Sequence, residues 1–138
     1  MRTLNYSKYL SVMLWLVALH SLLVGIGLIA MPASYMEQMG YGTCSEQFFR
    51  WQGGVFHIAM AVGYSMAAYN SIRFECLVVF SITLKLFATV FLFSYFIFIS
   101  SLPVIILSGV SDFLMGIVVL ILYRLTKNIM QAGVKSEK

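Results

Sequence analysis

Four long apolar stretches of this chain each carry a single polar or ionisable side chain near their middle. The four are His20, His57, Lys85 and Asp112. About 20 apolar residues in a helix cover the roughly 30 Å of hydrocarbon in a bilayer. A polar group inside hydrocarbon is costly, so it usually faces other helices and marks a pair or a site. The pattern predicts an all-α membrane protein with a polar core.

The apolar stretches define four predicted transmembrane helices. They cover residues 10–31, 48–69, 76–99 and 104–123. No charge occurs between Lys8 and Glu37, and Pro32 ends the first helix because proline keeps the residue before it out of the α region. We therefore expect one domain, an antiparallel four-helix bundle, followed by a basic cytoplasmic tail over residues 124–138 that frays.

The loop between the first two helices, residues 34–47, is the longest. A short surface helix is expected to begin at Ser34, because Tyr35 suits the membrane interface, where amphipathic aromatic side chains concentrate. The segment Gly40-Tyr41-Gly42 then signals a turn. We expect this loop to cap the outer end of the bundle.

The composition supports a bilayer environment and argues against several other classes of protein. Of the 138 residues, 61% are hydrophobic and 10% are charged, whereas a soluble domain is about half apolar and about a quarter charged. No basic face interleaved with aromatic residues points to nucleic acid. The chain has no phosphate-binding loop, HExxH motif or nucleophile elbow, so a non-catalytic role is favoured.

Basic residues predict the orientation in the membrane. Those expected on one side are Arg2, Lys8, Arg73, Arg124, Lys127, Lys135 and Lys138. Only Arg50 flanks the other side. Because cytoplasmic segments of membrane proteins are enriched in Lys and Arg, both termini should be cytoplasmic. The expected partners are the lipid bilayer and either another membrane protein or a second copy of the chain.

Cysteine spacing predicts neither a disulfide nor a metal site. Cys44 and Cys76 fall near opposite membrane faces in this topology, which is too far apart for a disulfide. The chain has no CxxC motif and no Cys/His spacing typical of zinc or of a redox pair.

The four lone polar residues fall at similar depth. Because a helix rises about 1.5 Å per residue, each lies roughly 12 to 15 Å from one face of the bilayer. Lys85 and Asp112 have opposite charges on sequential antiparallel helices, and one interpretation is a buried pair that fixes the helix register. The alternatives are a relay for protons or anions, or a Lys85 side chain that extends to the cytoplasmic headgroups, since the Cβ vectors of the two residues diverge.

His20 and His57 lie at equal depth on adjacent helices. Two axial imidazoles on two helices can hold a b-type haem, for which Gly53 and Gly54 would supply the space. Quinone or proton chemistry is a further alternative. A lone histidine in a membrane helix is more often a hydrogen-bond partner of a neighbouring helix, and we favour this interpretation, with no cofactor.

Small and polar residues form one face on each of two predicted helices. The faces comprise Arg50, Gly54, His57, Ala61, Tyr64 and Ala68, and Gly109, Asp112, Gly116 and Val119. Small residues let membrane helices approach closely, so both faces should point inward. Arg50 either clamps an anionic headgroup or substrate or pairs with Glu46 one turn earlier. We interpret Tyr64 as a packing residue.

The layout is similar to that of a known group of proteins. A first helix ending in proline, a longer outer loop and a second helix that begins Phe49-Arg50-Trp51-Gln52-Gly53-Gly54 resemble the small bacterial four-helix membrane proteins that include the DoxX-like proteins. The resemblance covers about residues 10–124. It implies the bacterial inner membrane and a shared structural or headgroup-binding element at Arg50 and Gly53. Some relatives are associated with thiosulfate:quinone redox chemistry or oxidative-stress complexes, but a redox cysteine motif is missing here.

Three functions remain open at this point. The favoured one is a non-catalytic accessory subunit or small-ligand-binding module built on the polar core, with Arg50 at its boundary. The second is a quinone- or haem-linked redox subunit. The third is a dimeric transporter of a small anion or of protons, because four helices are few for a complete transporter.

Overall fold

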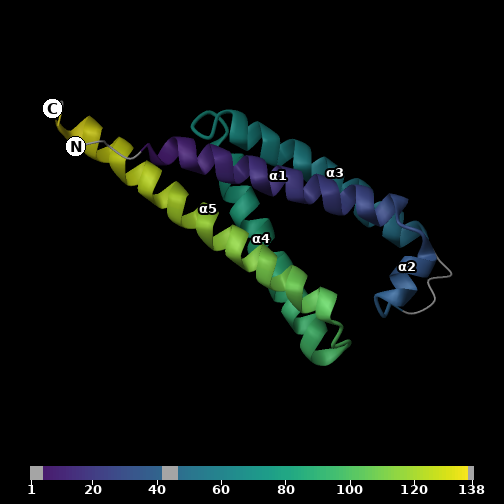
Figure 1. Cartoon of the computed structure of the whole chain (residues 1–138). Coiled ribbons are helices and arrows are strands. Elements are labelled where there is room, and N and C mark those ends of the chain that lie inside the picture. The colour runs from purple at the N-terminus through teal and green to yellow at the C-terminus, as the bar shows by residue number, and fades with distance from the viewer. Residues whose placement is uncertain (1–4, 42–46, 137–138) are drawn as a thin grey trace.

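Apolar sequence and helix-ending residues divide the chain into consecutive α-helices (Figure 1). The computed structural model describes residues 5–41 and 47–136. The helices are α1 (Tyr6–Ala30), α2 (Ala33–Gln38), α3 (Phe48–Tyr69), α4 (Glu75–Phe98) and α5 (Pro103–Ser136). Within the described ranges there is no β-strand, which confirms the all-α prediction.

The predicted helix boundaries are close to the observed ones, except that α1 begins at Tyr6 and not near residue 10, and that α5 is longer than predicted. Asn5 caps α1 by accepting a hydrogen bond from the Lys8 backbone N–H at 3.3 Å, and Pro32 separates α1 from α2. The last helix does not end near residue 123 but continues to Ser136, so the expected frayed tail is helical instead. Residues 124–132 contain no Gly or Pro and are mostly good helix formers.

The helices are arranged as two antiparallel pairs. α1 packs against α3, and α4 packs against α5. The pairs meet through α1 and α5 and, less extensively, through α3 and α4. Figure 1 shows that they converge at the end where α1 begins and α5 ends, and spread apart toward α2 and the α4–α5 turn.

Glycine and serine residues bring α1 and α3 together. Gly25 and Gly54 face each other so closely that a Cβ on either would lie 2.8 Å from the carbonyl oxygen of the other. Ser11 Oγ donates a hydrogen bond to the Ala68 carbonyl oxygen at 2.6 Å and so ties the two helices together nearer their other ends. The small face of α3 therefore points inward, as predicted.

The segment after α2 lies between the α1–α3 pair and the α4–α5 turn. Gly40 adopts a φ of +90°, which favours glycine, and a Cβ at this position would meet the Leu102 side chain at 2.7 Å. Burial and the neighbouring Tyr95 hydroxyl raise the pKa of Tyr41. The first half of the long loop thus reaches across to the α4–α5 end.

Large apolar side chains cover much of the outer surface. Leu23, Phe87 and Leu107 are each more than 60% exposed, which is unusual for a surface in contact with water. α1, α4 and the Pro103–Ala132 part of α5 are long and apolar enough to cross a membrane. α3 is not in this group, and it carries Arg50 and His57 along its length.

Candidate functional site

A buried ion pair joins α4 to α5. Lys85 Nζ donates to Asp112 Oδ1, and the two residues are 5% and 9% exposed. Gly116, one turn after Asp112, leaves room for the lysine stem, since a Cβ there would lie 3.1 Å from Lys85 Cβ. Lys85 is therefore directed into the molecule, toward Asp112, and does not extend along the surface.

Tyr64 of α3 completes the surroundings of this pair. It is 4% exposed, and Lys85 Nζ lies 6.0 Å from the centroid of its ring, within the range of a cation–π interaction. The sequence placed Tyr64 on the inward face, seven residues after His57, but its neighbour across the helix interface was not predicted. Through Tyr64, the α1–α3 pair contacts the charged centre of the α4–α5 pair.

His20 and His57 are half-buried beside this centre. Ser21 Oγ donates a hydrogen bond to the His57 carbonyl oxygen at 2.9 Å and lies 3.3 Å from His57 Nδ1. The charges of Lys85 and Asp112 act electrostatically on both imidazoles. The structure joins Lys85 to Asp112 directly, and the favoured hydrogen bond from a neighbouring helix is present at His57.

The packing of α1 leaves no space for a haem beside the glycines of α3. Gly54 is in contact with the backbone of Gly25 and the side chain of Ile29. A Cβ at Gly53 would meet the Leu28 side chain at 3.8 Å. The room that a macrocycle needs between α1 and α3 is therefore filled by α1. Among the described residues, no group of three or more His, Cys, Asp or Glu side chains is placed to hold a metal ion.

Arg50 lies apart from the polar core, about two helical turns from His57. Its Nη1 donates a hydrogen bond to the Met31 carbonyl oxygen at 3.0 Å, at the C-terminal end of α1. A cation is favourable there because the helix dipole places partial negative charge at that end. The proposed partner Glu46 lies outside the described residues, as does Cys44, and Cys76 is exposed.

Comparison of the chain with models of protein families, with curated proteins and with solved structures finds no match. Function is therefore inferred from the side chains and their geometry.

Proposed function

We propose that this chain is a four-span protein of the bacterial inner membrane, related to the DoxX-like group, that acts as a non-catalytic accessory subunit or small-ligand-binding module. The fourth span is α3. Its 22 residues measure about 33 Å as a helix, enough for the hydrocarbon core. Its polar face lies against other helices, which is how a membrane helix tolerates residues such as His57 and Arg50.

The observation that supports this proposal is a buried ion pair whose charges act on two half-buried imidazoles. Lys85 and Asp112 neutralise each other, so the pair by itself is sufficient to fix the register of α4 and α5. The histidines go beyond this structural role. In the described part of the chain, the His20 ring has no hydrogen-bond partner. At His57, Nε2 has none either. These ring nitrogens are available to a small polar ligand or to a group on a partner protein.

The test compares wild-type protein with a His20→Leu/His57→Leu variant purified from the same membranes. A small molecule or partner subunit that co-purifies with the wild type should be lost from the variant, whereas helix content and elution volume should stay the same. The variant should also fail to complement a deletion strain. Identical bound species together with full complementation would contradict a ligand- or partner-binding role for the core.

Transport is a second candidate, favoured by the same grouping. Imidazole, ammonium and carboxylate groups close together within a membrane are typical of proton and ion pathways. Reconstituted into liposomes, a transporter of a small anion or of protons would show flux that Asp112→Asn abolishes. Wild-type liposomes without flux would exclude this candidate. A Soret band or an extractable quinone in the purified protein would favour the redox alternative.

A further inference from the structure

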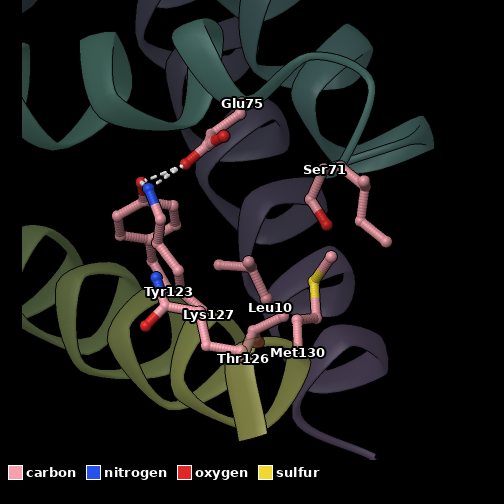
Figure 2. Close-up of a pocket in the computed structure, with 9 residues that line it drawn as sticks. Leu10, Ser71, Glu75, Tyr123, Thr126, Lys127 and Met130 are labelled. Carbon is pink, nitrogen blue, oxygen red and sulfur yellow. Dashed lines mark hydrogen bonds and ion pairs between the residues drawn. The ribbon is translucent and has the colours of Figure 1, made fainter. Parts of the chain in front are cut away.

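A pocket of about 460 Å³ opens at the end of the molecule where α1 begins and α5 ends (Figure 2). It lies where α1, the α3–α4 turn and α5 converge. Leu10, which is 1% exposed, lines the pocket from α1. Ser71 and Ile72 contribute from the turn and Met130 from α5, so most of the lining is apolar. This pocket is separate from the polar core, which lies about ten residues deeper along α4.

The polar side of the pocket carries an ion pair whose charges cancel. Glu75 Oε1 accepts hydrogen bonds from Tyr123 Oη at 2.5 Å and from Lys127 Nζ at 2.6 Å. Both donors use the same carboxylate oxygen, and Figure 2 shows them on one side of Glu75. Among the described residues, Glu75 Oε2 and Ser71 Oγ make no hydrogen bond. The pocket therefore offers an acceptor and a hydroxyl without net charge.

We propose that this pocket binds a neutral, single-chain amphiphile with a hydroxyl headgroup. The hydroxyl donates to Glu75 Oε2 and accepts from Ser71, and the chain packs on Leu10 and Met130. An ionic headgroup is disfavoured because Glu75 and Lys127 already compensate each other. The volume is near the lower end of the range for ligand pockets, which suits one chain better than two. This inference rests on the proposed membrane location, which places a pocket at the ends of long apolar helices within reach of an amphiphile in the bilayer.

The test uses 1-decanol carrying a photoreactive diazirine in its chain, added to the full-length protein in phosphatidylcholine nanodiscs. Cross-linked peptides mapped by mass spectrometry should be enriched around Leu10, Ile72 and Met130 over those facing the lipid. Met130→Trp, which fills the pocket, should reduce this labelling by about tenfold. Glu75→Gln should reduce it by about fivefold, through loss of one acceptor.

The matched control is Ile129→Trp, which adds the same side chain at a neighbouring position. Ile129 and Met130 are both about half exposed, at 53% and 46%, but only Met130 lines the pocket. The Ile129→Trp variant should be labelled to the same extent as the wild type. Equal labelling of the two tryptophan variants would overturn the assignment of the binding site to this pocket. Labelling by diazirine analogues of decanoic acid or didecanoylglycerol as strong as that by the decanol probe would overturn the neutral, single-chain assignment. The variants of His20 and His57 should label normally, which separates this site from the polar core.

Discussion

Lys85 shows how a charged side chain is held at mid-depth between apolar helices. Its ammonium group pairs with Asp112, its stem passes Gly116, and the Tyr64 ring lies near its charge. Removing one member of the pair leaves the other charge uncompensated, which is more destabilising than removing both. We expect Lys85→Met or Asp112→Asn alone to lower the free energy of unfolding by about 3 kcal/mol, and the double substitution to restore most of the loss.

Unfolding of the three variants and the wild type, followed by circular dichroism in one detergent, measures this coupling. The double-mutant cycle is its own control, because it isolates the interaction between the two side chains. If the double variant were no more stable than the less stable of the two single variants, Lys85 and Asp112 would act independently.

The Tyr64 ring provides a second residue-scale prediction. Tyr64→Phe keeps the ring near Lys85, so its stability should stay close to that of the wild type. Tyr64→Leu loses the ring and leaves space in a buried position, and we expect a loss of about 2 kcal/mol in the same unfolding measurement. If the two variants were equally stable, the interaction between the ring and Lys85 would contribute nothing measurable.

At the residue scale, the sequence predicts the level at which a polar side chain lies along its helix, but not which side chain it contacts. Helix rise converts the positions of Lys85 and Asp112 into a common level, but it does not decide whether the Lys85 side chain turns toward Asp112 or away from it. Their pairing depends on Gly116 lying opposite the lysine stem, which is a consequence of how α4 and α5 pack as whole helices. The position of Tyr64 beside Lys85 was not predicted for the same reason. The distance between α3 and α4 depends on how both helices pack and cannot be derived from the sequence of either helix alone.

At the scale of elements, the contact between α1 and α3 depends on two facing glycines. A Cβ at Gly25 or Gly54 would collide with backbone on the opposite helix, and backbone cannot move aside as a flexible side chain can. We expect Gly25→Ala and Gly54→Ala each to lower the free energy of unfolding by about 2 kcal/mol. Thermal unfolding in detergent measures the effect.

The same two helices contain matched controls. Gly27 on α1 and Gly63 on α3 have open space where a Cβ would lie. Gly27→Ala and Gly63→Ala should therefore be neutral or slightly stabilising, since alanine is the better helix former. Equal loss of stability at all four positions would mean that close approach of the helices is not what these glycines provide.

The end of α1 is more predictable than the end of α5. Pro32 is a local signal that ends α1 as the sequence indicates, whereas the cap at Asn5, which starts α1 four residues before the predicted span, was not predicted. The basic residues after residue 123 suggested a solvated tail. The helix nevertheless continues to Ser136, since Thr126 is buried and Lys127 binds Glu75 of α4, which lies 52 residues earlier in the chain.

At the scale of the whole molecule, two helical pairs share one polar centre and converge at one end. The four polar positions were predicted to lie at one depth; the structure joins two of them, Lys85 and Asp112, and places Tyr64 of the other pair near their charges. The spread of the pairs toward α2 was not predicted, because the prediction of an antiparallel four-helix bundle specified no angle between the helices. Glycine and serine residues determine which helices lie next to each other. They do so through contacts that exist only once the helices have paired, so the pairing cannot be predicted from one helix alone.

The number of membrane crossings is the decisive property at this scale. Alkaline phosphatase, which is active only outside the cytoplasm, and green fluorescent protein, which forms its fluorophore inside, are fused after Tyr41, Arg73, Ser101 and Lys138. Four crossings with both termini inside predict active phosphatase after Tyr41 and Ser101 and fluorescence after Arg73 and Lys138. If α3 does not cross, phosphatase becomes active after Arg73, the chain has three spans, and its termini lie on opposite sides. The fusion after Arg73 therefore decides whether the polar face of α3 is enclosed within the membrane.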